Sequence, residues 1–287
     1  MQEVILDTLW DSVKLIPFLF LAYLAMEYLE HNAAWQAQRV IRKGGRLGPL
    51  FGGLLGIVPQ CGFSAAASNF YAGRVISLGT LIAVYLSTSD EMLPVLISEV
   101  GRIGWMPILK ILLLKALIGI AMGFLVDLLI RPHKDDHDHI HEMCEHDHCH
   151  CKKGGSILRS AAVHTVKILL FLLVISFLLN TVLHFLGEDV LKNLILNRPI
   201  IGCLIAALVG LIPNCAASVA LTQLYLEGAM GFAACMSGLL SGSGIGILVL
   251  FRNNKNKKEN LMILLLVYGI GALAGILMEF MPFLNTL

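Results

Sequence analysis

The fold is decided by a short stretch that occurs twice, as Gly56-Ile57-Val58-Pro59-Gln60-Cys61-Gly62 and as Gly210-Leu211-Ile212-Pro213-Asn214-Cys215-Ala216. Each copy interrupts an apolar segment, which covers 47–72 in the first case and 199–226 in the second. Proline removes a backbone N–H and blocks the preceding helical turn, and nearby polar residues can satisfy the freed backbone groups. Each segment is therefore predicted to form two short helices that meet at a Pro-amide-Cys tip.

The two tips belong to a longer repeat with a constant spacing of 154 residues, as from Cys61 to Cys215. Ser87 and Ser89 return at the same spacing as Ser241 and Ser243. We therefore interpret the chain as two homologous halves, 1–130 and 160–287, joined by a hydrophilic linker at 131–159. The other recurring pairs are Gly48 and Gly202, Gly56 and Gly210, Pro59 and Pro213, Ser64 and Ser218, and Tyr71 and Tyr225.

The composition excludes an ordinary soluble enzyme. Of the 287 residues, 57% are hydrophobic and 14% are charged, and the mean hydropathy is +0.78, whereas soluble domains carry about 25% charged residues. The formal net charge of +1 gives no basic surface for a nucleic acid. A membrane span needs roughly 20 apolar residues, so we predict an all-α integral membrane protein with about 8–10 membrane segments in a lipid bilayer.

Loop charges indicate how the two halves are oriented, because Lys and Arg favour the cytoplasmic side of short loops. The loop at 39–46 is basic, whereas its counterpart at 188–198 is balanced. Later the order reverses, since Glu99 balances Arg102 while the loop at 252–259 is basic. We therefore predict two inverted-topology repeats, each with a re-entrant or broken-helix hairpin, with a cytoplasmic linker and both termini outside.

Two inverted hairpins would bring their tips together near the middle of the membrane, where inverted-repeat transporters bind substrate. The tips offer amides, thiols and hydroxyls but no nucleophile–base pair, which favours transport over catalysis; the alternative is that these residues only turn a hairpin. Thiols suit thiophilic metals or trivalent metalloids, and oxygen ligands suit harder cations, so both classes stay open. The candidate substrate-binding residues are Gln60, Cys61, Ser64, Asn214, Cys215 and Ser218, with Ser87, Ser89, Ser241 and Ser243.

The third apolar segment of each half contains a stretch of small polar residues, at 86–91 and at 240–244. Glycine and serine weaken a helix interior, and carbonyls exposed at membrane depth are tolerated only where they line a cavity or pack against protein. We expect both stretches to be unwound.

Two acids, Asp90 and Glu91, lie in the first of these stretches. An ionisable residue inside a membrane segment is energetically costly, so its default interpretation is functional, as a cation ligand or as a proton carrier in coupling. The alternative is a buried ion pair with Lys110 or Lys115. In the second half, Gly244 stands at the position that matches Asp90. Only the first half therefore supplies a carboxylate at this position.

The linker has a metal-binding composition, with seven histidines and three cysteines in the 19 residues 133–151. The spacing defines no fixed site, and we predict a transition-metal sensor, buffer or capture segment on the cytoplasmic side; the alternative is a solvated linker that binds metal only adventitiously. No cofactor is required for transport. The candidate ligands are His133, His137, His139, His141, Cys144, His146, His148, Cys149, His150 and Cys151.

The duplicated tips, the duplicated halves and the histidine-rich loop together resemble a bacterial family of ten-helix heavy-metal exporters. Members of that family are labelled arsenic-efflux permeases or manganese transporters. If each hairpin counts as two helices, the chain has ten. The resemblance implies a multi-pass protein of the inner membrane. It points to Cys61 and Cys215 for a trivalent arsenical, and to Gln60, Asp90, Glu91 and Asn214 for a divalent cation.

The sequence thus predicts a secondary-active transporter that exports a heavy metal or metalloid by alternating access. The chain contains no Gly-x-x-x-x-Gly-Lys-Ser/Thr motif, so an ion gradient rather than ATP bound to this chain is expected to drive transport. Three alternatives stay open. These are a carrier of a small organic anion, a metal importer whose linker senses the cytoplasm, and an intramembrane enzyme or membrane-bound metal chaperone.

Overall fold

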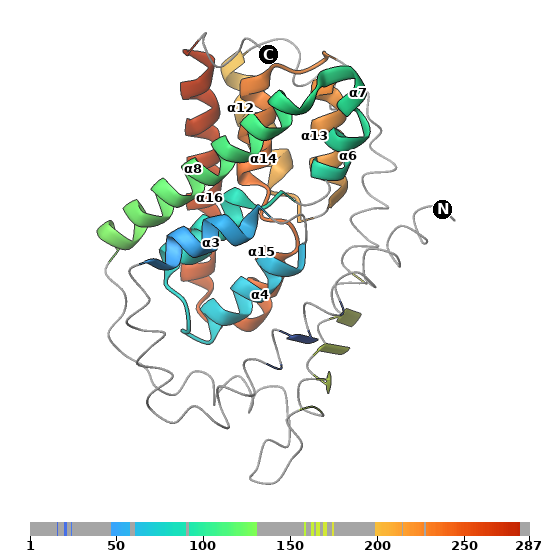
Figure 1. Ribbon diagram of the computed structural model, residues 1–287. Coiled ribbons are helices and arrows are strands. Elements are labelled where there is room, and N and C mark those ends of the chain that lie inside the picture. The colour runs from blue at the N-terminus through green and yellow to red at the C-terminus, as the bar shows by residue number, and fades with distance from the viewer. Residues whose placement is uncertain are drawn as a thin grey trace, which may run out of the picture.

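The computed structural model describes residues 47–57, 61–89, 92–130, 199–213, 215–226 and 228–281, with a few further positions between 16 and 24 and between 158 and 174. Every regular element in these ranges is a helix (Figure 1). The ten predicted linker ligands between His133 and Cys151 lie outside the described residues, as do Gln60, Asp90, Glu91 and Asn214.

Both interrupted segments form the predicted pairs of short helices. The first consists of α3 (Gly48–Gly56) and α4 (Cys61–Ala72), and the second consists of α12 (Pro199–Gly210) and α13 (Cys215–Leu226). In each pair the second helix begins at the cysteine of the Pro-amide-Cys tip. Its free N–H groups, and the positive end of its dipole, are therefore at the tip.

The third apolar segment of each half is also divided, as predicted. The first half contains α5 (Leu78–Ser87) and α6 (Met92–Ser98), and the second contains α14 (Phe232–Ser241) and α15 (Gly246–Asn253). Gly244, between α14 and α15, has a φ of 55°, in the left-handed region that glycine adopts without strain. The small polar residues at these positions thus coincide with the ends of α5 and α14, midway through an otherwise apolar segment.

A long helix completes each half, and one short helix was not predicted. α8 (Trp105–Leu129) and α16 (Lys257–Glu279) are the long helices, and the short α7 (Val100–Ile103) precedes α8. The positive φ of 78° at Gly104 separates α7 from α8.

Corresponding helices pack in the same way in the two halves. α3 packs against α5 and α8, and α12 packs against α14 and α16. Glycines allow the close approach of the long helices: a Cβ on Gly119 of α8 would lie 2.9 Å from the Ala83 carbonyl oxygen, and one on Gly271 of α16 would lie 3.0 Å from that of Ser237. Ala83 and Ser237 are 154 residues apart, whereas Gly119 and Gly271 are 152 residues apart. The sequence repeat is therefore two residues shorter at the last helix than at the preceding helices.

The second helix of each interrupted segment packs across to the other half. α4 lies against α15, and α13 lies against α6 (Figure 1). α5 and α14 also contact one another. The two halves therefore interlock at the places where their helices are broken.

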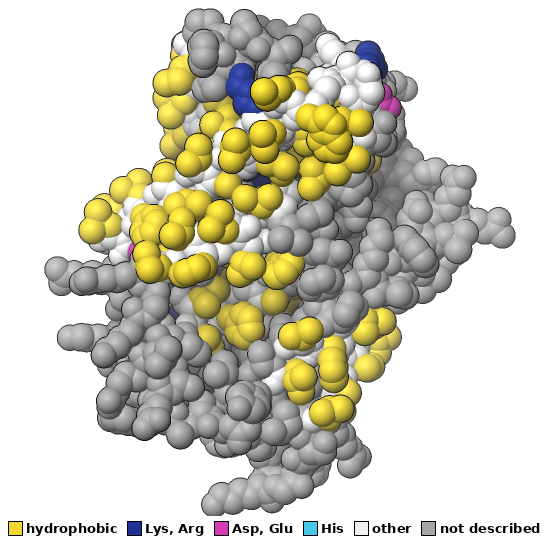
Figure 2. Space-filling model, viewed as in Figure 1, with side chains coloured by type: hydrophobic (Ala, Val, Ile, Leu, Met, Phe, Trp, Pro, Cys, Tyr) yellow, Lys and Arg dark blue, Asp and Glu magenta, His cyan; other side chains and the backbone are white. Residues whose placement is uncertain are grey.

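Within the described ranges, three helical stretches are long and apolar enough to cross a membrane: Trp105–Leu129, Phe232–Asn253, which includes the break between α14 and α15, and Lys257–Glu279. Hydrophobic side chains cover the exposed side of α8, where Met106 is 79% exposed (Figure 2). Leu273 of α16 is 62% exposed. Such an apolar surface is unfavourable in water and suits the hydrocarbon of a bilayer.

Candidate functional site

The broken segment of the second half lies directly against the first hairpin. Gly246, the first residue of α15, faces Ser64 of α4 so closely that a Cβ on Gly246 would lie 2.8 Å from the backbone carbonyl carbon and oxygen of Ser64. Ser64 is fully buried. The predicted substrate residue Ser64 is therefore at an interface between the two halves.

Ser68, one turn along α4 from Ser64, links three helices through its buried hydroxyl group. The hydroxyl oxygen lies 2.6 Å from the carbonyl oxygen of Ser64, 2.7 Å from the hydroxyl of Tyr85 on α5, and 2.7 Å from the carbonyl oxygen of Gly246 on α15. Hydrogen bonds among buried groups are strong because no water competes for them. This polar contact fixes the first hairpin against the break between α14 and α15.

The four candidate serines of the breaks are all buried, but their hydroxyls differ in their partners. Ser87 donates to the carbonyl oxygen of Ala83 at 2.7 Å. Ser241 lies 2.9 Å from the carbonyl oxygen of Ala207 and so links α14 to α12. Ser89 makes a long contact of 3.3 Å with the Ser87 carbonyl oxygen. The hydroxyl of Ser243 has no hydrogen-bond partner within the described ranges.

A buried lysine is the main residue that sequence reasoning did not place in the site. Lys115, in the middle of α8, has an exposed fraction of 1%. Its ammonium group donates to the carbonyl oxygen of Thr88 at 2.5 Å and to that of Leu239 at 2.7 Å. The sequence feature that could have identified Lys115 is its position within a long apolar segment, because a charged residue inside a membrane segment usually has a functional role.

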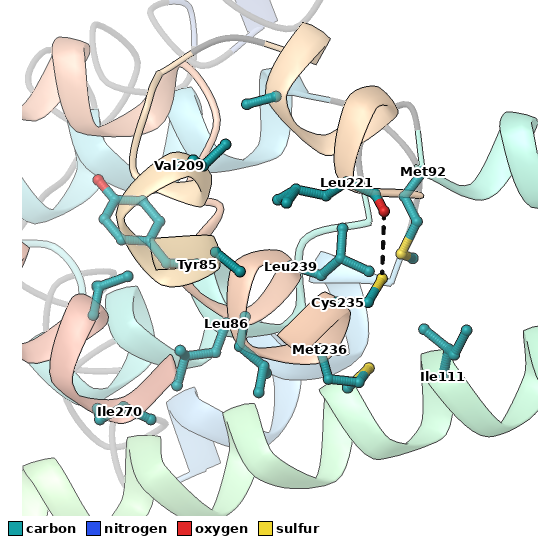
Figure 3. Close-up of a cluster of buried hydrophobic side chains, with 14 of the residues drawn as sticks. Tyr85, Leu86, Met92, Ile111, Val209, Leu221, Cys235, Met236, Leu239 and Ile270 are labelled. Carbon is teal, nitrogen blue, oxygen red and sulfur yellow. Dashed lines mark hydrogen bonds between the residues drawn. The ribbon is translucent and has the colours of Figure 1, made fainter. Parts of the chain in front are cut away.

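At the other crossing, between α13 and α6, the described residues include an apolar cluster. Figure 3 shows Leu221 of α13, Met92 of α6 and Cys235 of α14 gathered near Ile111 of α8, and the Cys235 thiol lies 3.8 Å from the Leu221 carbonyl oxygen. Met92 holds the position that Gly246 holds in the second half. Thr222 of α13, at the position that matches Ser68, donates to the carbonyl oxygen of Ser218 within its own helix at 2.7 Å, and no hydrogen bond from it to α6 is found among the described residues.

A charged cluster joins the two halves at the far end of α4. Arg74, in the turn after α4, makes two hydrogen bonds to Glu259 of α16, at 2.7 and 2.8 Å. Tyr71 also donates to Glu259, and the Asn254 amide lies 3.2 Å from it. The hydrogen bond to Glu259 raises the pKa of Arg74 above its ordinary value.

A family model described as "Putative, 10TM heavy-metal exporter" matches the chain over residues 1–176 and 116–251. The chain belongs to this family. No curated protein and no solved structure matches the chain.

Membership of the 10TM heavy-metal exporter family confirms the resemblance identified in the sequence. It makes the chain a multi-pass membrane protein of a transporter family rather than of an enzyme class. The exposed apolar surfaces of α8 and α16 agree with that assignment.

The structure describes some of the predicted site residues of this chain more fully than others. Cys61 and Cys215 are the first residues of α4 and α13, and the positions of their side chains lie outside the description. Ser218 is half-buried on α13. Cys203 and Cys235 are buried free cysteines. No group of three His, Cys, Asp or Glu residues that could hold a metal lies in the part of the chain that the structure describes.

The Arg74–Glu259 pair gives a stability prediction for this protein. Replacing Glu259 with glutamine keeps its shape but removes the charge, so we expect the free energy of unfolding to fall by about 1 kcal/mol, because the pair is partly exposed. Denaturant unfolding of the detergent-purified protein measures the change. The control is Glu279→Gln at the other end of α16, where the described residues supply no hydrogen bond or ion pair; equal losses for the two variants would contradict the prediction.

Proposed function

We propose that this chain is a secondary-active transporter that exports a heavy metal or metalloid by alternating access between two inverted repeats. The observation that carries the proposal is the contact of α4 with α15, in which the Ser68 hydroxyl bonds to the Gly246 carbonyl oxygen and the Ser64 backbone packs closely against Gly246. It joins a hairpin of one half to the broken helix of the other. Broken helices whose ends meet between repeats are the usual site of substrate and ions in such transporters.

Two features of the structure support the inverted arrangement. First, α4 and α13 exchange partners, each packing against the broken segment of the opposite half. Second, if the first hairpin enters and leaves the membrane on the cytoplasmic side, the turn at 73–77 that follows it is cytoplasmic. The basic loop at 252–259 is predicted to be on that side too. Arg74 and Glu259 join these two loops.

The proposed substrate site consists of the two tips and the unwound segments beside them. Cys61 and Cys215 would bind a trivalent arsenical or another thiophilic metal through sulfur, while Gln60 and Asn214 would suit a divalent cation such as manganese. The buried Ser243 hydroxyl would add an oxygen ligand from the second half. The linker at 131–159 would bind metal in the cytoplasm as a sensor or buffer, and the membrane would be a bacterial inner membrane.

Uptake into everted membrane vesicles tests this proposal, because such vesicles expose the cytoplasmic face to the assay. We expect uptake of arsenite or a methylated trivalent arsenical to fall about tenfold or more in Cys61→Ala/Cys215→Ala, because the thiolates are the ligands. The matched control is Cys203→Ala/Cys235→Ala, which removes the same number of thiols from buried positions away from the tips.

The other outcomes distinguish the alternatives. Manganese or zinc uptake that survives loss of both tip cysteines would assign the site to the amides and to Asp90. Uptake only into right-side-out vesicles would indicate an importer. Absence of uptake of arsenite, the methylated arsenical, manganese and zinc would contradict the proposal and favour an organic-anion carrier.

A further inference from the structure

Lys115 connects the two halves at the point where their helices are broken. Its ammonium group contacts Thr88 of the first half at 2.5 Å and Leu239 of the second half at 2.7 Å, through backbone carbonyl oxygens in both cases. The side chain reaches them from the middle of α8 and is shielded from solvent. A single cation thus contacts main-chain oxygens from both repeats.

Both carbonyl groups are at helix C-termini. Thr88 is the residue that caps α5, and Leu239 lies in the last turn of α14. Carbonyls at a helix C-terminus lack intrahelical donors and form the negative end of the helix dipole. In broken-helix transporters, such carbonyls coordinate the coupling sodium ion or proton. The Lys115 ammonium therefore has the surroundings of a bound alkali cation.

Packing of the long helix does not require this charge. Lys115 lies four residues before Gly119, and Val267 lies four residues before Gly271, the glycine that makes the equivalent contact in the second half. Val267 is fully buried. Because a buried charge costs more than a well-packed apolar residue, valine would serve a purely structural role better at position 115.

We propose that Lys115 is a tethered cation that takes the place of a coupling alkali ion, so that the exporter works without sodium or potassium. This inference rests on the proposed transport function. Lys115 acts as a positioning residue: it holds the ends of α5 and α14 together and so fixes how the breaks that follow these two helices lie relative to one another. The substrate binds elsewhere, at the tips.

Removing the ammonium group and supplying a small cation from solution tests the proposal. Lys115→Ala leaves space beside the two carbonyl groups. We expect substrate uptake into vesicles that carry this variant to fall about tenfold and to recover in part when methylammonium or sodium is added. Lys115→Met fills the space with an apolar side chain and should stay impaired with either cation. Lys110→Ala, which removes a half-buried lysine from the same helix, should behave as the wild-type protein.

A second measurement does not depend on transport. Methylammonium should raise the melting temperature of purified Lys115→Ala but not that of the wild-type protein or of Lys115→Met, since ligands stabilise only the state that binds them. If the wild-type protein transports no substrate, the proposed function fails, and the melting experiment still tests the cation site.

Three results would overturn the proposal. The first is a sodium or potassium requirement for wild-type transport. The second is wild-type transport by Lys115→Met. The third is a melting temperature of Lys115→Ala that does not respond to methylammonium or sodium.

Discussion

Replacing Gly246 with valine is expected to reduce transport about 100-fold, because it displaces the first hairpin from the break between α14 and α15. Even a Cβ at this position would lie 2.8 Å from the backbone of Ser64, a distance that requires the backbone to shift. Gly246→Ala should therefore already lower the free energy of unfolding by about 1–3 kcal/mol, as overpacking usually does. Vesicle uptake measures the first effect and denaturant unfolding the second.

The control for Gly246 is Gly269, a glycine of α16 outside the broken segment. A Cβ on Gly269 would meet no atom of the described residues within 4 Å. Gly269→Ala should then transport and unfold like the wild-type protein. Normal transport by Gly246→Val, or equal damage from alanine at both positions, would show that the close contact with Ser64 is not required.

Replacing Asp90 with asparagine is expected to lower transport about 100-fold without preventing insertion into the membrane. Asp90 lies outside the described residues, but Ser89 and Met92 on either side of it are each 1% exposed. A carboxylate in such a segment is costly to retain unless it binds a cation or carries a proton. Gly244 holds the matching position, so the second half supplies no substitute.

Vesicle uptake and the amount of protein in the membrane fraction should be measured on the same preparations of Asp90→Asn. Glu99→Gln is the control, because Glu99 is an acid in the turn between α6 and α7, at the other end of α6 from Asp90. Normal flux through Asp90→Asn would remove this carboxylate from the mechanism.

The helix ends could be predicted from the sequence because proline, glycine and serine act on the few residues around them. The beginnings of α4 and α13 and the ends of α5 and α14 are all of this kind. The repeat made these predictions stronger, since each break was visible twice. The short helix α7 was missed because its four residues carry no pattern of their own.

Contacts between distant segments could not be predicted in the same way. Ser68 and Gly246 are 178 residues apart, and the hydrogen bond uses a backbone carbonyl group, which every residue has. The carbonyl partners of Lys115 have no sequence signature for the same reason. Arg74 and Glu259 were visible only as charges in loops, because their pairing depends on how α4 and α16 are placed in space.

The difference between Lys115 and Val267 bears on how the chain was assembled from two related halves. A dimer of two separate first halves would place two ammonium groups at the crossing of the broken helices, where they would repel each other in a low-dielectric interior. A dimer of two second halves would leave both carbonyl ends without a cation. Joining the halves in one polypeptide would fix the ratio at one lysine for two helix ends, which would make the halves complementary rather than interchangeable.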